Sequence, residues 1–424
     1  MTAANSTTGS VAGSPRARTA ISNRRRWGVV GLQFAASLIN YLDRATISVA
    51  LPVISVSLHL GPATKGLLLS AFFFSYALMQ VPIGWFADRL DLKWIYSGMF
   101  ALWSFACGFT GFAGSLEVLI ACRLLLGIGE SVYLPGGTKI VSILFGPEER
   151  GLPSGLFDSG IRFGLALGAP LIAWLIVLFG WRKMFMLVGI IGFLWLIPWW
   201  IVCPARLGAS QEGQASPRRS QTFLQVLRYL RNRNLIGICL GFFCFDYYWY
   251  LQVTWLPDYL VTARHLTILK AGLYASLPYL VWAFSEPLGG WLADHLIRRG
   301  WDETRGRKLM VTVAFLLGLL LIPAAKVGNV HAAILLVMGA SLVGLSVGNL
   351  FAILQSCAPP EDVALWTGFE NFFGNVGGII APSATGLLIA RTGSYLPGFA
   401  LAALVLVTGL LAYWFIVGEL KPPS

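Results

Sequence analysis

One run of apolar residues, long enough to cross a lipid bilayer, contains the pentapeptide Asn40-Tyr41-Leu42-Asp43-Arg44. A charged side chain costs roughly 2.5–3.5 kcal/mol at the centre of a membrane helix on insertion scales. The adjacent carboxylate of Asp43 and guanidinium of Arg44 are therefore expensive in this position. Charges kept at such a depth usually handle an ion, a proton or a charged solute.

Other apolar runs carry further ionisable residues. Arg123 and Glu130 are seven residues apart, so two helical turns place them on one face, and Gly127 between them leaves room for a close neighbour. Asp158 and Arg162 are four apart with the acid first, the favourable order for pairing within one helix. Such groups could also serve only as buried contacts between helices, and this alternative stays open for Asp158 with Arg162 and for Glu286. The other buried candidates are Tyr76, Asp246, Glu286, Glu370 and Asn371, and Lys139 is expected to extend to the lipid headgroups.

The composition predicts the elements that hold these residues. The chain has 424 residues, of which 56% are hydrophobic and only 12% are charged, whereas a soluble domain has about 25% charged residues. Twelve apolar stretches are each long enough to cross a bilayer as a helix. We therefore expect an all-α membrane protein with twelve transmembrane helices. The stretches start near Trp27, Gly66, Trp94, Leu116, Gly151, Lys183, Leu235, Ala271, Arg307, Ala332, Val363 and Tyr395.

The formal net charge of +12 could indicate a nucleic-acid partner, but its distribution follows membrane topology instead. Lys and Arg concentrate in alternate segments between the apolar stretches, as they do in cytoplasmic loops. We therefore expect a multi-pass protein of the cytoplasmic (inner) membrane with both termini in the cytoplasm, in contact with anionic lipid headgroups and not with nucleic acid. The basic segments are 16–26, 89–93, 150, 206–233, 298–308 and 421.

The two halves of the chain repeat one another. Segments that enter or leave an apolar stretch recur at an offset of 206 or 213 residues, in the same order, which predicts two parallel six-helix halves. The matches are 84–90 with 290–296, 40–41 with 246–247, 147–149 with 360–362, and Gly155, Asp158 and Gly164 with Gly368, Asn371 and Gly377. The expected parts are a disordered cytoplasmic tail (1–26), an N-terminal half (27–203), a cytoplasmic linker (204–233), a C-terminal half (234–417) and a cytoplasmic tail (418–424).

This layout resembles the major facilitator superfamily. The segment from Gly84 to Lys93 is similar to the superfamily's loop signature after the second span, although Asp91 stands where the pattern usually has Gly. The resemblance implies that Asp88 acts in a latch at the cytoplasmic side. Alternatively, Asp88 caps a helix and Arg89 orients the protein in the membrane. The candidate gating residues are Gly84, Asp88, Arg89 and Asp294.

Four motifs make the resemblance closer, and together they look like the anion:cation symporter family. They are Asn40 to Arg44, the spacing of Arg123 and Glu130, Trp255-Leu256-Pro257, and the stretch from Asn371 to Gly378. The family includes proton-coupled uptake systems for sugar acids. The similarity extends from Trp27 to about Val417.

The family pattern, carried over position by position, implies that Asp43 and Glu130 are the protonatable pair and that Arg44 anchors a substrate carboxylate. The chemistry agrees, because arginine presents a planar fork that fits a carboxylate. Competition between an acid and an anion for one arginine makes proton and anion binding interdependent. The resemblance further implies that Arg123 modulates the acids and that the substrate is contacted by Tyr41, Tyr76 and Asn371.

Two features set this chain apart. Its fifth span reads Phe157-Asp158-Ser159-Gly160-Ile161-Arg162, where the sugar-acid members commonly have Asn and Gln or Ser. Arg162 is therefore expected to give the pocket a second cationic contact suited to a dianion, beside Asp158 at the repeat position of Asn371. The aromatic residues of span seven are expected mainly to pack or to face lipid, with an aromatic substrate as the alternative.

Together these features predict a monomeric secondary carrier that imports an organic anion with protons by alternating access, with no cofactor or metal. The six cysteines show no metal-site spacing. The sequence offers neither a nucleophile paired with a histidine base nor a Gly-Lys-Ser phosphate loop, so we do not expect an enzyme. The alternatives are a proton-coupled exporter of metabolites or drugs, and a non-transporting membrane sensor, which would need a signalling domain or a long tail.

Overall fold

The computed structural model describes residues 21–60, 62–205, 207, 227–266 and 268–422. Most of the predicted tail (1–20) and of the predicted linker (206 and 208–226) lies outside these residues, as do residues 423–424. The described chain consists of helices and their connections and contains no strand.

The N-terminal half forms six crossings. They are α1 (Asn23–Ser57), α2 (Pro62–Arg89), α3 (Leu92–Phe109), α4 with α5 (Leu116–Glu130 and Tyr133–Leu144), and the two parts of α6 (Gly151–Val202). The helix α6 is divided at Gly180, whose φ of 76° and ψ of 160° are not helical. Glycine adopts a positive φ at little cost, so this residue separates two crossings that a Cβ-bearing residue would strain.

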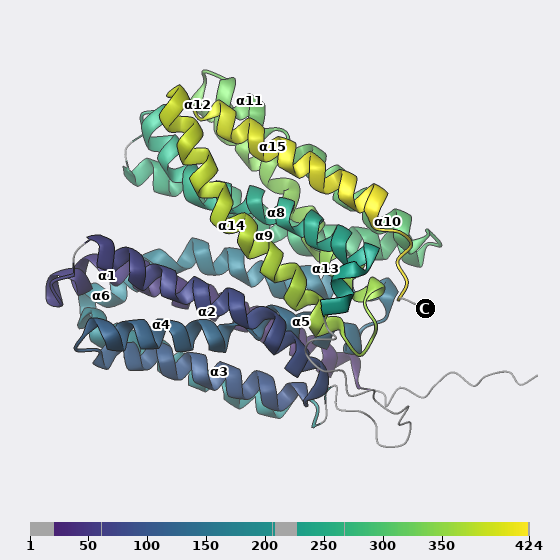
Figure 1. Ribbon diagram of the computed structural model, residues 1–424, viewed down its shortest axis with the longest axis horizontal. Coiled ribbons are helices and arrows are strands. Elements are labelled where there is room, and N and C mark those ends of the chain that lie inside the picture. Colours follow the sequence, from purple (N-terminus) through teal and green to yellow (C-terminus); the bar gives the residue numbers. More distant parts are fainter. Residues whose placement is uncertain (1–20, 61, 206, 208–226, 267, 423–424) are drawn as a thin grey trace, which may run out of the picture.

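The C-terminal half forms the other six crossings, drawn in green and yellow above the first half in Figure 1. They are α8 (Arg233–Asp258), α9 (Ile268–Arg298), α10 with α11 (Glu303–Gly318 and Leu321–Lys326), α12 with α13 (Val330–Ala340 and Val347–Cys357), α14 (Val363–Thr392) and α15 (Leu396–Leu411). By length and composition alone, eight described segments could cross a membrane. The other crossings are α1, α2, the first part of α6, and α9, which hold polar residues of the central site. The predicted fold class is confirmed.

Glycines at repeat positions let the helices that carry the site approach closely. A Cβ on Gly164 of α6 would lie 2.8 Å from the carbonyl oxygen of Leu38 in α1. A Cβ on Gly377 of α14 would lie 2.7 Å from the carbonyl oxygen of Phe243 in α8. The sequence repeat therefore corresponds to equivalent helix contacts, α1 with α6 and α14 with α8, in the two halves.

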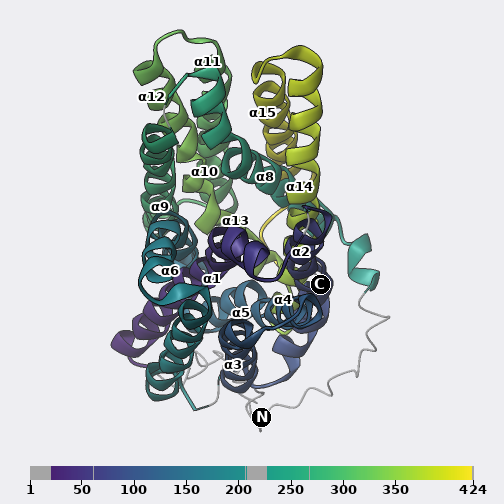
Figure 2. The same ribbon diagram turned by 90° about the vertical axis from the view of Figure 1, so that its left-hand side faces the viewer.

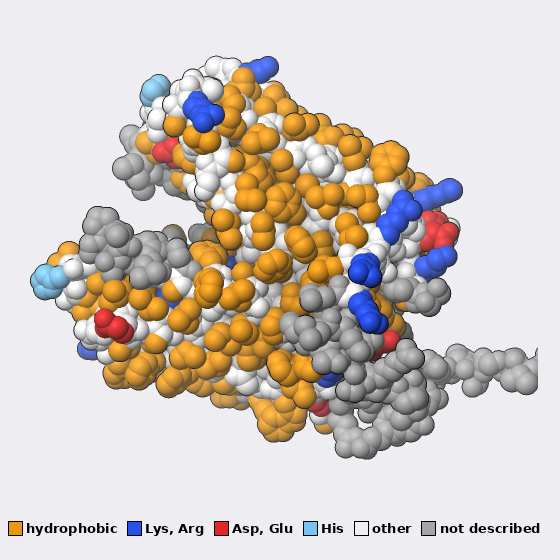
Figure 3. Space-filling model, in the orientation of Figure 1, with side chains coloured by type: hydrophobic (Ala, Val, Ile, Leu, Met, Phe, Trp, Pro, Cys, Tyr) orange, Lys and Arg blue, Asp and Glu red, His pale blue; other side chains and the backbone are white. Residues whose placement is uncertain are grey.

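The halves meet at one end of the molecule and diverge at the other. They diverge toward the end that carries the connection between α11 and α12, which we call the open end (Figures 1 and 2). The described C-terminus lies at the opposite, closed end. Figure 3 shows the cleft that enters the molecule from the open end, and it contains a cavity of about 310 Å³.

Two acids join the halves at the closed end in equivalent ways. Asp88, at the end of α2, accepts hydrogen bonds from the backbone N–H groups of residues 364 and 365, at 3.1 and 2.7 Å. Asp294, at the end of α9, accepts them from residues 151 and 152, at 3.1 and 2.8 Å. Each carboxylate thus caps a helix of the other half, where free N–H groups and the helix dipole favour an anion.

A basic side chain completes each cap. Lys139 lies 2.8 Å from Asp88, and Arg307 lies 3.1 Å from Asp294. Each base also donates a hydrogen bond to a backbone carbonyl of the opposite half. The expectation that Lys139 extends to the lipid headgroups is wrong, because its side chain is held at the interface by an acid and a carbonyl and is 5% exposed.

The remaining gating candidates also lie at this interface. A Cβ on Gly84 or on Gly290 would collide with a backbone carbonyl of the opposite half. Arg89 makes a longer ion pair, 3.8 Å, with Asp362 of the C-terminal half. Asp91 caps α3 with a φ of −66°, so the turn after the second span does not need the glycine of the signature.

We predict that Asp88→Asn shifts the protein toward a state open at this end. Breaking a buried ion pair costs about 3–5 kcal/mol, comparable to the few kcal/mol that separate conformations of a carrier. Thr367, which shares a 2.7 Å hydrogen bond with Thr138 across the interface, supplies the probe position. Maleimide labelling of Thr367→Cys should rise several-fold in the Asp88→Asn background. Asp91→Asn is the control, and unchanged labelling in both backgrounds would contradict the prediction.

Candidate functional site

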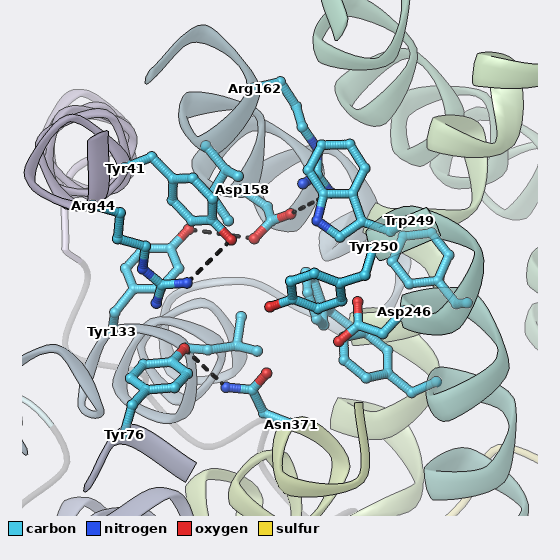
Figure 4. Close-up of a pocket in the computed structure, with 15 residues that line it drawn as sticks. Tyr41, Arg44, Tyr76, Tyr133, Asp158, Arg162, Asp246, Trp249, Tyr250 and Asn371 are labelled. Atoms are coloured by element: carbon cyan, nitrogen blue, oxygen red, sulfur yellow. Dashed lines mark hydrogen bonds and ion pairs between the residues drawn. The ribbon is translucent and has the colours of Figure 1, made fainter. Parts of the chain in front are cut away.

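Two adjacent pockets lie between the halves. Both are lined by Tyr41 and Arg44 of α1 and by Trp249 and Tyr250 of α8. The outer pocket is the cavity of about 310 Å³ in the cleft. The inner pocket is the one drawn in Figure 4. Residues of both halves therefore line the same space.

Arg44 lies on the cavity wall within a cage of aromatic rings. Its Nε donates to Oε2 of Glu130 at 3.0 Å, and its Nη1 lies 3.4 Å from the hydroxyl of Tyr41. Its Cζ lies 4.6, 5.0 and 4.6 Å from the ring centroids of Tyr41, Phe72 and Tyr76. Cation–π contacts contribute about 0.5–2 kcal/mol, so the rings hold the guanidinium in place. The side chain is 14% exposed and can be reached from the cavity.

Glu130, the counter-ion of Arg44, is fully buried at the end of α4. Its Oε1 has no hydrogen-bond partner among the described residues, and neither does the side-chain amide of Asn40. A buried polar atom without a partner costs about 1–3 kcal/mol. The charge of Glu130 therefore depends on Arg44.

Asp43 points away from the cavity toward α3. It accepts hydrogen bonds from the indole Nε1 of Trp103 at 2.6 Å and from the thiol of Cys107 at 3.5 Å. It lines neither pocket. This differs from the expectation of one chamber shared with Arg44 and Glu130, because adjacent residues of a helix point about 100° apart.

Arg123 lines the outer pocket. It is within electrostatic range of both Asp43 and Glu130. Its Nε and Nη2 have no hydrogen-bond partner in the described part of the chain. Gly127, one turn on, packs against Phe72 of α2, as the spacing suggested. Arg123 is thus a buried cation with free donors beside two acids.

Arg162 makes contacts in both halves. Its Nε lies 2.9 Å from Oε1 of Glu286 in α9, and its Cζ lies 3.6 Å from the ring centroid of Trp249 in α8. The expected partner within the same helix, Asp158, is more distant, at 3.8 Å. Asp158 instead accepts a hydrogen bond from Tyr133 at 3.3 Å. Arg162 and Asp158 both line the inner pocket, as expected.

The C-terminal half supplies an amide and an acid to the inner pocket. The side-chain amide of Asn371 donates to the hydroxyl of Tyr76 at 3.1 Å and thereby joins α14 to α2. Asp246 of α8 lies across the pocket from Arg44 (Figure 4) and makes no hydrogen bond or ion pair with the residues described. Asp246 is thus an acceptor available to a solute.

Sequence reasoning missed the functional position of Trp249 and Tyr250. The expectation that the aromatic residues of span seven mainly pack or face lipid does not hold for these two, which line both pockets. The repeat offset of 206 residues was the available signal, since it places Tyr250 at the position of Arg44 and Trp249 at that of Asp43. The contact of Glu286 with Arg162 had no such signal, because it joins different halves.

Glu370 of α14 is a fully buried acid outside the cavity, and neither of its oxygens has a partner in the described chain. Burying an unpaired carboxylate costs several kcal/mol, so we expect Glu370 to be protonated. Glu370→Gln should therefore change the unfolding temperature of the purified protein little. The matched control is Asp294→Asn, which breaks an ion pair and should destabilise the protein by about 3–5 kcal/mol. An equal loss in both variants would mean that Glu370 is charged.

The model of the Major Facilitator Superfamily matches residues 34–382. The "Probable galactarate/D-glucarate transporter GudP" of Escherichia coli K12 is 31% identical over 429 residues, which cover 94% of this chain and 95% of that protein. The "D-galactonate transporter" of Escherichia coli O6:H1 is 31% identical over 418 residues, which cover 94% and 97%. The "Uncharacterized transporter YybO" of Bacillus subtilis is 31% identical over 412 residues, which cover 93% and 95%.

Solved structures share the fold. The transporter FucP in its outward conformation matches with a TM-score of 0.74 at 15% identity, covering 92% of this chain and 99% of that chain. A bacterial homologue of the human lysosomal transporter Spinster, inward-facing and unoccupied, matches with a TM-score of 0.60 at 20% identity, covering 95% and 100%. The resemblance drawn from the motifs is confirmed: the chain belongs to the Major Facilitator Superfamily, among relatives that are named as transporters of sugar acids.

Proposed function

We propose that this protein imports a sugar acid, or a similar organic carboxylate, together with protons across the inner membrane. The observation that carries the proposal is the pair of Arg44 and Glu130, a cation reachable from the cavity whose counter-ion is a fully buried acid. Relatives named as galactarate, glucarate and galactonate transporters support the substrate class.

A sugar acid combines a carboxylate with several hydroxyl groups, and the pocket offers groups for both. The guanidinium of Arg44 fits the carboxylate as a planar fork. The phenol groups of Tyr41 and Tyr76 can donate to or accept from hydroxyl groups, and the carboxylates of Asp158 and Asp246, which line the same space, can accept from them.

Coupling follows from competition for Arg44. A substrate carboxylate that binds this guanidinium replaces Glu130, which then loses its ion pair and keeps only the longer-range attraction of Arg123. An uncompensated buried charge costs about 3–5 kcal/mol, so the complex is stable when Glu130 has taken a proton. Asp43 is the second protonation site that we propose, and Arg123, within range of both acids, transmits the change between them.

Alternating access uses the two ends of the molecule. We assign the closed end to the cytoplasm, because this end holds Arg89, the last residue of α2, and Arg307, near the start of α10. Basic residues near the ends of membrane helices are enriched on the cytoplasmic side. The structure then corresponds to an outward-open state. Rocking of the halves would break the caps at Asp88 and Asp294, and release of the protons inside would free the substrate.

Transport into proteoliposomes tests the proposal. Labelled galactonate and galactarate are offered with the outside more acidic, with the gradient reversed, and with a protonophore. Symport into the cell predicts accumulation only when protons enter together with the substrate. An exporter by proton exchange would accumulate substrate under the reversed gradient, and a sensor would transport neither acid under any condition.

A further inference from the structure

Arg162 repeats the arrangement of Arg44 on the other side of the site. Both are cavity-lining arginines, and each is bonded through Nε to one oxygen of a fully buried glutamate, at 3.0 Å to Glu130 and at 2.9 Å to Glu286. The second oxygen of each glutamate has no partner among the described residues. Arg44 and Glu130 belong to one half, whereas the pair of Arg162 and Glu286 joins α6 of one half to α9 of the other.

Negative groups outnumber positive ones around Arg162. One guanidinium faces two carboxylates, Glu286 at 2.9 Å and Asp158 at 3.8 Å. Asp246 of α8 is within electrostatic range of Arg162 and adds a third acid. Of the other helices packed on α9, η5 (Ser341–Ser346) and α13 have no acid or base. The only titratable side chain of α12 is His331 near its start, at the open end. Arg307 and Glu303 of α10, and Glu148 and Glu149 of η2 (Pro147–Glu149), lie at the closed end with Asp294.

We propose that Arg162 binds the second carboxylate of a dicarboxylate substrate and that Glu286, displaced from it, takes up a proton from the water of the cleft. A dianion then binds with one proton more than a monoanion, which uses Arg44 alone. This inference rests on the proposed function and specifies its substrate class and its proton count.

Of the two acids beside Arg162, Glu286 is the one that takes up the proton. Asp158 keeps the hydroxyl of Tyr133 as a donor at 3.3 Å when Arg162 turns away. In the described chain, Arg162 is the cation beside Glu286, and the other donor near it is the neutral indole of Trp282. A carboxylate close to another carboxylate, buried and without a cation, favours its neutral form. When a substrate carboxylate binds Arg162, Glu286 therefore loses its counter-ion and takes up a proton.

The experiment compares the binding of galactarate, a dianion, with that of galactonate, a monoanion, to the purified full-length protein. Dissociation constants are measured between pH 6.5 and 8.5, where both acids are fully ionised. Each proton taken up on binding weakens affinity tenfold per pH unit where the free group is ionised. We expect the affinity for galactarate to fall more steeply than that for galactonate, by a further factor approaching ten per unit. Equal slopes in the wild-type protein would overturn the inference without any variant.

Two variants locate the extra proton. Glu286→Gln should make the slopes for the two acids equal, because the competitor for Arg162 is then neutral. Asp158→Asn, the matched change at the other acid beside Arg162, should keep the difference. A difference that persists in Glu286→Gln, or that disappears only in Asp158→Asn, would contradict the assignment. If neither acid binds the wild-type protein, the proposed function fails as well, so the two failures are distinguishable.

Discussion

Glu130→Gln is expected to abolish proton-driven accumulation while leaving exchange of labelled for unlabelled substrate. Glutamine keeps the volume of the side chain and can still accept from the Nε of Arg44, but it does not titrate. One pH unit is worth about 1.4 kcal/mol per coupled proton, so a gradient of 1.5 units should concentrate substrate about 30-fold per proton in the wild-type protein. The variant should not accumulate substrate in response to this gradient.

Exchange separates a loss of coupling from a loss of binding. Exchange needs only a site that opens alternately to both sides, and in the variant Arg44 remains available to the substrate. Glu117→Gln is the matched control, since it makes the same change at an exposed position of the same helix, α4. Full proton-driven uptake by Glu130→Gln would remove Glu130 from the coupling mechanism.

The repeat between the halves and the patterns within single helices predicted much of this architecture. The repeat at 206 residues predicted that Asp88 and Asp294 are equivalent, and each does cap a helix of the opposite half. The spacing of Arg123 and Glu130 predicted a common face, and Gly127 between them does admit α2. Such predictions succeed because the helical period fixes which side chains of one helix lie together.

What the sequence did not predict depends on contacts between helices far apart in the chain. Nothing local indicates that Arg162 prefers Glu286 to Asp158, because the shorter contact joins residues 124 positions apart. The direction of Asp43 is set in the same way by Trp103, which lies on α3. Lys139 could reach the headgroups by length alone, but Asp88 holds it at the interface. The period of a helix orients its residues relative to one another, whereas the neighbouring helices decide which face meets a partner.

Arg44→Ala is expected to weaken substrate binding more than a hundredfold, the equivalent of about 3 kcal/mol or more for a lost buried charge contact. Arg44→Lys keeps the charge but loses the planar fork, and a hydrogen bond to a charged group contributes about 1.5–3 kcal/mol. The affinity of the lysine variant for the substrate should therefore be about 10- to 100-fold lower than that of the wild-type protein. Arg182→Lys is the control, since the hydrogen bonds of Arg182 within the described residues go to the backbone carbonyls of residues 111 and 113.

Arg44 also neutralises Glu130, so a loss of transport in Arg44→Ala could reflect a damaged fold. The double variant Arg44→Ala/Glu130→Gln distinguishes the two roles. Removing the arginine alone leaves a buried charge and should destabilise the protein by about 3–5 kcal/mol, whereas the double variant contains no unpaired ion at this position. Thermal unfolding should therefore recover in the double variant, while exchange transport should not. Recovery of exchange transport together with stability would mean that Arg44 holds α1 against α4 and does not bind the substrate.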